Sequence, residues 1–115
     1  MKRGEVYDAR LDPVEGSEQS GTRPVVIVSR ESMNQAGNVV IAVPCTTYRA
    51  GRRKYHSQVL VDAGEGGLTV QSVVLSEQVR VMNKTRLVRL RGVVSGRVMQ
   101  EIERALLIAM DLPGQ

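Results

Sequence analysis

The sequence has little of the chemistry that cysteine, histidine and aromatic side chains provide. Cys45 is the only cysteine and His56 the only histidine among 115 residues. One chain therefore cannot form an internal disulfide or a zinc site with four Cys or His ligands, and catalysis by a pair of histidines is excluded. Phe and Trp are absent, which argues against a platform of aromatic rings for stacked nucleic-acid bases. We expect neither a metal ion nor a cofactor.

Long hydrophobic runs are also missing. No apolar stretch follows the basic residues at the start of the chain, so we expect neither a secretory signal nor a membrane-spanning helix, and a cytoplasmic protein. A chain of this length buries about 65% of the surface that its unfolded form exposes. With 42% hydrophobic residues, it can form a core without disulfides. We expect a single domain over residues 1–115.

Acidic residues are missing from the two most basic segments. The chain has 16 Lys and Arg against 12 Asp and Glu, a net charge of +4. Residues 49–54 carry four of the positive charges and residues 80–97 carry six, whereas residues 1–48 have a net charge of −1. Clustered positive charge is typical of a surface that binds phosphates, and a merely solvated face explains it equally well on composition alone.

Short β-branched runs predict a mostly β fold. Residues 24–28 and 39–43 are continuous apolar runs, typical of strands buried on both faces, so we expect them at the centre of a sheet. Further strands are predicted over residues 4–11, 58–61, 73–75 and 87–90, with one helical turn between residues 31 and 38. The glycine-rich residues 63–67 lack the Lys-Ser/Thr of a phosphate-binding loop and indicate a tight turn.

Near the C-terminal end of the sequence, the spacing of the hydrophobic residues changes from a pattern typical of strands to one typical of a helix. One helical face is predicted to contain Val98, Ile102, Ala105, Leu106 and Ala109. Ser95 is the expected N-cap, and Pro113-Gly114 the expected stop. The whole pattern predicts an α+β, mostly β domain, in which a small, partly open barrel of the SH3-like kind is covered by a C-terminal helix.

Several short blocks stand in a fixed order along the chain. They are Arg3-Gly4-Glu5-Val6-Tyr7, Leu11-Asp12-Pro13, Gly16-Ser17-Glu18-Gln19 with Gly21 and Arg23-Pro24-Val25-Val26, Val43-Pro44-Cys45-Thr46-Thr47, and Ser76-Glu77-Gln78-Val79-Arg80. In this order and spacing they resemble the MazF/PemK family of bacterial toxin–antitoxin systems, almost end to end. The resemblance implies a MazF/CcdB-like barrel and a homodimeric, metal-independent endoribonuclease. Such an enzyme cleaves single-stranded RNA at short sequence motifs and is inhibited by a cognate antitoxin.

Metal-free RNA cleavage uses the 2′-hydroxyl of the substrate as nucleophile and leaves a 2′,3′-cyclic phosphate and a 5′-hydroxyl. Arginine suits the charge stabilisation, because its planar fork grips two phosphate oxygens. Arg23 stands between a glycine-containing loop and Pro24 at the start of a buried strand, a rigid base for such a side chain. A guanidinium loses its proton only above about pH 12, so we expect Arg23 to stabilise charge, with proton donation as a further role; the general base stays unassigned.

The family's catalytic arginine and threonine correspond to Arg23 and Thr46. We expect Thr46 at the end of the next central strand, where Pro44 disfavours further pairing and the hydroxyls of Thr46 and Thr47 can face a cleft. Thr46 then donates a hydrogen bond to a non-bridging phosphate oxygen. The ordinary alternatives are an ion pair of Arg23 with Glu18 or Glu77, and a threonine present for its β propensity.

Residues expected to bind RNA lie on three segments of the chain. They are Ser17, Glu18, Gln19, Thr47, Arg49, Arg52, Arg53, Lys54, Gln78 and Arg80. Contacts to unpaired bases are expected from Ser17, Glu18 and Gln19 in the first loop and from Gln78 and Arg80 on a later strand, because Glu and Gln can read Watson–Crick edges. The basic loop is expected to grip phosphates, with a merely mobile, solvated loop as the alternative. Cys45 is interpreted as a buried filler and His56 as a solvated loop residue.

Two other classes of function stay open on the sequence. A gyrase-poisoning toxin of the CcdB type shares the MazF fold and needs no Arg23/Thr46 pair, but it has a C-terminal Trp that this chain lacks. A non-catalytic nucleic-acid-binding barrel is also compatible with the charge pattern. For the toxin, the expected partner is an antitoxin whose acidic, partly disordered tail covers the basic groove and excludes RNA.

Overall fold

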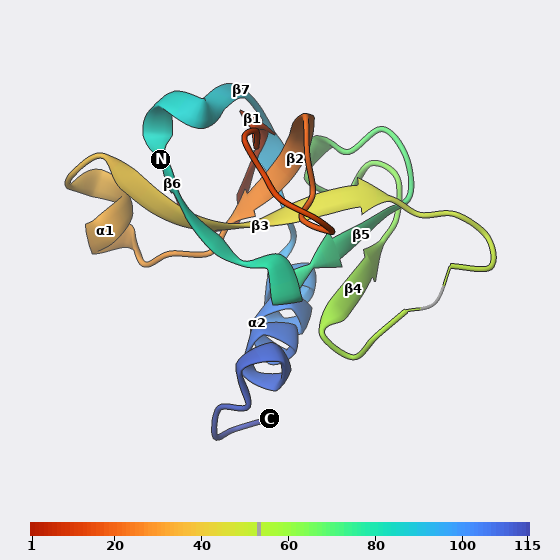
Figure 1. Ribbon diagram of the computed structural model, residues 1–115. Coiled ribbons are helices and arrows are strands. Elements are labelled where there is room, and N and C mark those ends of the chain that lie inside the picture. Colours follow the sequence, from red (N-terminus) through yellow and green to blue (C-terminus); the bar gives the residue numbers. More distant parts are fainter. Residues whose placement is uncertain (53) are drawn as a thin grey trace.

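The computed structural model describes residues 1–52 and 54–115. In this part of the chain seven strands form one antiparallel sheet in the order β4-β5-β3-β2-β1-β7, with β6 paired to β3 (Figure 1). The strands are β1 (Glu5–Arg10), β2 (Thr22–Ile27), β3 (Val39–Thr47), β4 (Gln58–Val61), β5 (Ser72–Leu75), β6 (Arg80–Asn83) and β7 (Leu87–Val93). The sheet curls without closing, so the predicted mostly β, partly open barrel is confirmed.

The central position predicted for residues 24–28 and 39–43 is confirmed, because β2 and β3 pair in the middle of the sheet. Each is buried on both faces. Val25 and Ile27 pack on one side with Met82, and Val26 packs on the other side with Val43. Alternate residues of a strand point to opposite faces, so these two strands contribute to two hydrophobic clusters at once.

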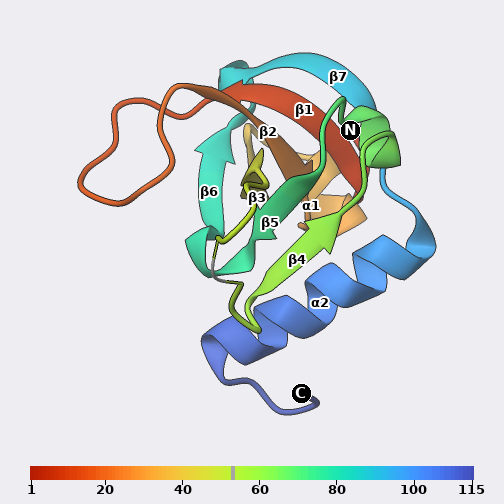
Figure 2. The ribbon, with the colours of Figure 1, turned by 90° about the vertical axis from the view of Figure 1, so that its right-hand side faces the viewer.

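The predicted C-terminal helix is α2 (Gly96–Met110), which lies along β4 on one side of the sheet (Figure 2). Ser95 is its N-cap, as predicted: the Ser95 Oγ accepts a hydrogen bond from the amide of Val98 at 3.2 Å. Ile102 is fully buried on the inner face, but Ala109, predicted to lie on that face, is exposed. The helices of the described residues fall short of the length and hydrophobicity that a membrane-spanning helix needs.

Short helical turns connect the strands. They are α1 (Glu31–Gln35) and the 3-10 turns η1 (Glu65–Gly67), η2 (Ser76–Gln78) and η3 (Lys84–Arg86). The tight turn predicted for residues 63–67 is confirmed by η1. Gln78 ends η2 and Arg80 begins β6, so the later strand expected to carry both residues contains only Arg80.

The effect predicted for Pro44 is wrong. β3 continues through Pro44 to Thr47, and Thr46 pairs with Val73 of β5. The physical reason is a change of partner along one edge of β3. Residues 39–42 pair with β6 and residues 45–47 pair with β5, so Pro44, which has no N–H to donate, lies between the two ladders.

Candidate active site

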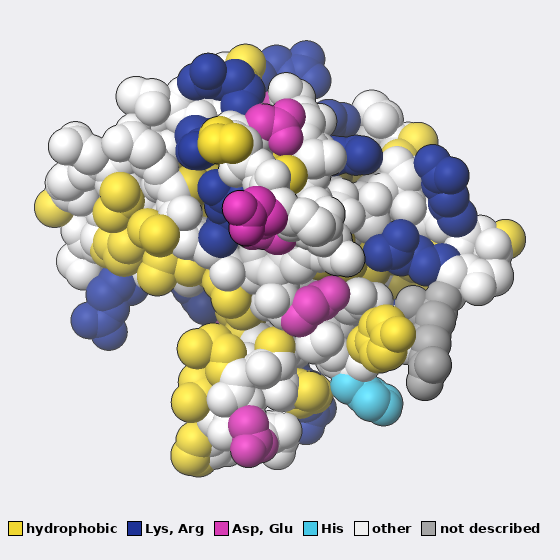
Figure 3. Space-filling view, in the orientation of Figure 1, with side chains coloured by type: hydrophobic (Ala, Val, Ile, Leu, Met, Phe, Trp, Pro, Cys, Tyr) yellow, Lys and Arg dark blue, Asp and Glu magenta, His cyan; other side chains and the backbone are white. Residues whose placement is uncertain are grey.

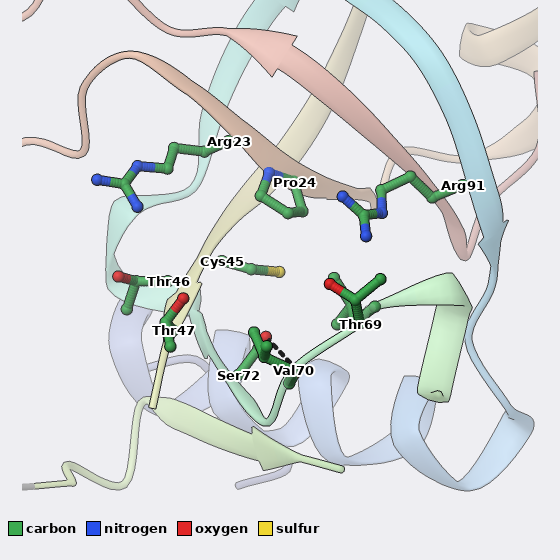
Figure 4. A pocket seen from close by; sticks show the side chains of 10 residues that line it. Arg23, Pro24, Cys45, Thr46, Thr47, Thr69, Val70, Ser72 and Arg91 are labelled. Atoms are coloured by element: carbon green, nitrogen blue, oxygen red, sulfur yellow. Dashed lines mark hydrogen bonds between the residues drawn. The ribbon is translucent and has the colours of Figure 1, made fainter. Parts of the chain in front are cut away.

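A cavity of about 190 Å³ opens beside the ends of β2, β3 and β7 (Figure 4). It is lined by Arg23, Pro24, Cys45, Thr46, Thr47, Leu68, Thr69, Val70, Ser72 and Arg91. Figure 4 shows Arg23, Thr46 and Thr47 on one side and Arg91 and Thr69 on the other, with the Cys45 sulfur between them. Two guanidinium groups and several hydroxyls therefore share one small space, a combination that suits an anion such as phosphate.

The pairing of β2 with β3 brings Arg23 and Thr46 to this cavity. Val25 lies opposite Pro44 in the antiparallel register. Two residues before Val25 stands Arg23, and two residues after Pro44 stands Thr46, so both residues reach the same end of the strand pair. Residues opposite each other in an antiparallel sheet project from the same face. Two residues far apart in the sequence thus become neighbours of one site.

Arg23 has guanidinium donors that no group in the described part of the chain uses. Its Nε donates to the carbonyl of Ser20 at 3.1 Å, and its Nη atoms have no partner among residues 1–52 and 54–115. Glu18 accepts a hydrogen bond from the amide of Glu15, and Glu77 accepts one from the Gln58 side chain. The ion pair weighed for Arg23 is therefore not formed with either carboxylate, and its planar fork is open to a ligand.

The hydroxyl groups around the cavity differ in their availability. The Ser72 Oγ donates to the carbonyl of Val70 at 2.9 Å. The half-buried Thr46 has no hydrogen-bond partner for its side chain in the described part of the chain, and Thr47 is exposed at the end of β3. Thr46 is thus able to donate to a ligand without breaking a bond within the protein.

Arg91 was not predicted as a site residue, although it lies in the basic segment 80–97. Its side chain is 15% exposed and borders the cavity opposite Arg23 (Figure 4). The Nη1 atom lies 3.1 Å from the Asp8 carboxylate, and Nε and Nη2 donate to the carbonyl of Gly67 at 3.3 and 3.1 Å. The only sequence signal was the charge run, which does not distinguish Arg91 from its neighbours.

Cys45 is fully buried at the back of the cavity. Burial raises the pKa of its thiol to about 12, although nearby Arg91 acts in the opposite direction. A thiol with so high a pKa stays protonated at neutral pH and is a poor nucleophile. The interpretation of Cys45 as a buried filler is confirmed for its location.

The first loop and the η2 turn meet at a second, smaller cavity of about 90 Å³. It is lined by Leu11, Glu18, Gln19, Pro44, Gln78, Val79 and Arg80. The Gln78 side chain accepts a hydrogen bond from the amide of Gln19 at 2.8 Å and donates to the carbonyl of Ser17 at 3.4 Å. Arg80 donates to the carbonyl of Leu11 at 3.2 Å. The predicted base-contacting residues are therefore brought together, and two of them also hold the loop in place.

Comparison with known proteins identifies the family. The model of a family described as PemK-like, MazF-like toxin of type II toxin-antitoxin system matches residues 2–110. The chain belongs to this toxin family. Endoribonuclease MazF from Staphylococcus saprophyticus is 38% identical over 112 residues, which are 97% of this chain and 92% of that protein. The predicted family is thus confirmed, and with it the MazF rather than the CcdB type of toxin.

Solved structures show the same fold. An endoribonuclease in complex with its cognate antitoxin, from a mycobacterial species, superposes with a TM-score of 0.81 at 27% identity, covering 100% of this chain and 99% of that chain. MazF from Deinococcus radiodurans superposes with a TM-score of 0.82 at 24% identity and 97% coverage of both chains. The MazF-like barrel expected from the sequence is therefore confirmed.

In this MazF/PemK toxin the described residues of the basic loop, Arg49, Arg52 and Lys54, are not among those that line the Arg23 cavity. Arg49 and Arg52 are exposed between β3 and β4, and Arg53 lies outside the described residues. Lys54 and His56 line a different groove, of about 570 Å³, between β4 and α2. Among the described residues no three His, Cys, Asp or Glu side chains are grouped as metal ligands.

Proposed function

We propose that this toxin is an endoribonuclease that cleaves single-stranded RNA at short sequence motifs without a metal ion. The observation that carries the proposal is that Arg23, with open guanidinium donors, and the unpartnered Thr46 hydroxyl face one cavity. The family membership and the 38% identity to an endoribonuclease support it. Both the RNA and an antitoxin would be met in the cytoplasm, the location expected from the sequence.

The proposed reaction is an internal transesterification. The 2′-oxygen of one ribose attacks the adjacent phosphorus, the bond from phosphorus to the 5′-oxygen breaks, and the products are a 2′,3′-cyclic phosphate and a 5′-hydroxyl. We assign to Arg23 the stabilisation of the negative charge of the phosphorane, and as a further role the protonation of the leaving 5′-oxygen. Thr46 donates a hydrogen bond to a non-bridging oxygen. The base that takes the proton of the 2′-hydroxyl is not assigned to a residue.

A second guanidinium extends this phosphate site. Arg91 faces Arg23 across the cavity, and three of its five N–H donors are used by Asp8 and Gly67. The two remaining donors can contact a phosphate of the bound strand. The smaller cavity with Glu18, Gln19 and Arg80 has the polar edges needed to read an unpaired base, and we assign base recognition to it.

The remaining predicted RNA contacts form the outer part of the proposed binding surface. Ser17 and Gln78 are joined by a hydrogen bond that helps to hold the loop between β1 and β2, which carries Glu18 and Gln19. Thr47 lies beside Thr46 at the cavity. The basic residues Arg49, Arg52, Arg53 and Lys54 are assigned to phosphates farther along the strand, where they act through charge and not through base identity.

The proposed inhibitor is an antitoxin with an acidic, partly disordered tail. Arg23 and Arg91 leave guanidinium donors available in the cavity, and a carboxylate matches the same planar fork as a phosphate. The tail would therefore compete with RNA for one site. The solved mycobacterial endoribonuclease in complex with its cognate antitoxin is a relative in which toxin and antitoxin assemble.

The proposed homodimer has a candidate surface that adjoins the smaller cavity, with which it shares Val79 and Arg80. A groove of about 350 Å³ is lined mostly by hydrophobic side chains, and its lining residues are Val28, Ser29, Ile41, Val79, Arg80, Val81, Leu106 and Met110. We call it the apolar groove. Figure 3 shows hydrophobic side chains gathered over β6 and along α2 on this face. RNA and an acidic tail are poor matches for such a lining, whereas a second copy of the chain offers the same apolar surface in return.

The test is cleavage of a mixed-sequence single-stranded RNA in excess EDTA by the wild type, Arg23→Ala and Arg30→Ala. We expect the wild type to cut at defined sites and to leave cyclic-phosphate and 5′-hydroxyl ends. Loss of one charge-stabilising donor costs about 10²–10³ in rate, which is the expected effect of Arg23→Ala. Arg30 is exposed and lies outside the cavity, so its variant controls for the lost charge.

Four outcomes would contradict the proposal. Cleavage that EDTA abolishes would exclude the metal-free mechanism. Equal activity of Arg23→Ala and Arg30→Ala would show that Arg23 takes no part in the reaction. A wild-type protein that binds the RNA without cutting it would favour the non-catalytic barrel, and one that neither binds nor cuts RNA would favour a protein target.

A further inference from the structure

Arg91 is held by an acidic residue outside the sequence blocks of the family. Asp8 in β1 uses both carboxylate oxygens. Its Oδ1 lies 3.1 Å from Nη1 of Arg91, and its Oδ2 lies 3.1 Å from Nη2 of Arg89. The side chains of Asp8 and Arg91 are 17% and 15% exposed, whereas that of Arg89 is 69% exposed. The Asp8–Arg91 pair is therefore shielded from water, and the contact with Arg89 is a surface pair.

An irregularity in β7 directs Arg91 toward Asp8 and the cavity. In the register of β1 with β7, Val6 lies opposite Gly92 and Tyr7 lies opposite Leu90, so Arg91 has no partner in β1. Arg91 is thus the extra residue of a β-bulge. Bulges turn a side chain away from the regular alternation of a strand and are common beside active sites.

The opposite side of the guanidinium is fixed by η1. Gly67 has a φ of +75°, and a Cβ at this position would lie 2.2 Å from the carbonyl oxygen of Arg91. Only glycine lets this turn approach β7 so closely, and the approach is what brings the Gly67 carbonyl to Nε and Nη2 of Arg91. The guanidinium is held between two acceptors, and its remaining donors stay at the cavity.

We propose that Asp8 is a positioning residue for RNA cleavage, which holds the Arg91 guanidinium in place to bind a phosphate of the substrate. The inference rests on the proposed function. Asp8 itself is negative, so through charge alone it would weaken the binding of RNA. A benefit to the reaction must therefore come through geometry, because a long arginine side chain that is not held loses its alignment with the phosphate.

The test compares single-turnover cleavage rates at saturating enzyme, which do not depend on the fraction of active protein. At saturating enzyme we expect Asp8→Ala to cleave RNA about tenfold more slowly than the wild type. A titration of the enzyme, measured separately, should give a half-saturating concentration that does not rise. In an Arg91→Ala background the same substitution should have no further effect, because Asp8 acts only through Arg91. Asp8→Glu, which keeps the carboxylate, should recover part of the rate. Glu103→Gln is the matched control, because it breaks the Arg3–Glu103 pair (2.6 Å), whose residues do not line the cavity.

The outcomes separate this inference from the proposed function. A wild type that does not cut RNA overturns both. If the wild type cuts RNA and Asp8→Ala keeps the full rate, only the role of Asp8 is overturned. The same conclusion follows if the Asp8→Ala substitution slows cleavage as much in the Arg91→Ala background as it does alone. If Asp8→Ala does not fold, Asp8→Asn replaces it: it matches in size but lacks the charge, and a smaller loss in the same direction is expected.

Discussion

Arg23 and Arg91 line the same cavity, but their side chains differ in how firmly the protein holds them. Within the described residues the Arg23 side chain makes one hydrogen bond, from its Nε to the carbonyl of Ser20, whereas Arg91 is fixed between Asp8 and Gly67. An unrestrained arginine side chain has about 2 kcal/mol of rotamer entropy to lose. Arg91 has lost this freedom on folding and is preorganised, while Arg23 can follow the phosphate as its charge changes during the reaction.

The thiol of Cys45 leads to a prediction on pH. Burial raises its pKa to about 12, whereas the thiol of an unfolded cysteine has a pKa of about 8.5. The folded state favours the protonated thiol, so this contribution to stability is complete below about pH 8.5 and is lost as the pH rises toward 12. At pH 8 we expect iodoacetamide to alkylate the native protein on the order of a thousandfold more slowly than the protein unfolded in guanidinium chloride. Mass spectrometry measures both rates; rapid, complete alkylation of the native protein would contradict the prediction.

At the scale of elements, the loop between β1 and β2 is held by Gln78. The side chain joins the amide of Gln19 and the carbonyl of Ser17, and these bonds hold the loop that leads to Arg23. Removing them costs about 1 kcal/mol, so Gln78→Ala should raise the population of the open loop about fivefold. A protease specific for glutamate would then cut after Glu15 and Glu18 about fivefold faster, and the choice of RNA sequence would broaden.

The control for this prediction is Gln100→Ala on the exposed face of α2. It removes the same side chain from a site that has no contact with the loop. Proteolysis of the control should match that of the wild type. Equal rates for all three proteins would show that Gln78 does not hold the loop, and would leave base contact as its remaining role.

Local patterns predicted most of the elements. The strand over residues 58–61 has the bounds of β4, because an apolar run between polar turns is visible in the sequence. β6 has no such signal, since Met82 is its only buried residue and Val81 is 58% exposed. Its strand conformation comes from pairing with β3, which is a long-range contact. Pro44 misled the prediction for the same reason: its place between two ladders depends on the partners of β3.

The site was predictable where it depends on short blocks and not where it depends on register. Arg23 and Thr46 stand in blocks that resemble the family, and the pairing of β2 with β3 brings both to one cavity. The position of Arg91 depends on a bulge, on Asp8 some 83 residues earlier in the chain, and on the close approach of Gly67. None of these leaves a periodic pattern in the sequence.

At the scale of the whole molecule, much of the positive charge also ties the fold together. Arg80, Lys84 and Arg86 donate to backbone carbonyls of other elements at 2.7 to 3.2 Å, and Arg89 pairs with Asp8. The basic segment 80–97 is thus neither only a phosphate-binding surface nor only a solvated face. Its side chains hold β6, η3 and β7 against the rest of the barrel and keep their charge while doing so.

The apolar groove leads to the prediction on assembly. Val81 is 58% exposed on β6 at this groove, so in the proposed homodimer Val81→Asp would bury a carboxylate in a largely apolar interface. Such burial costs several kcal/mol, and we expect the dissociation constant of the dimer to rise at least about a hundredfold. Val88→Asp places the same charge on β7, at a valine that is 60% exposed and outside the groove, and should leave the dimer intact. Sedimentation velocity at micromolar concentration measures both variants; a dimeric Val81→Asp, or a monomeric wild type, would contradict the assignment of this face to a second copy of the chain.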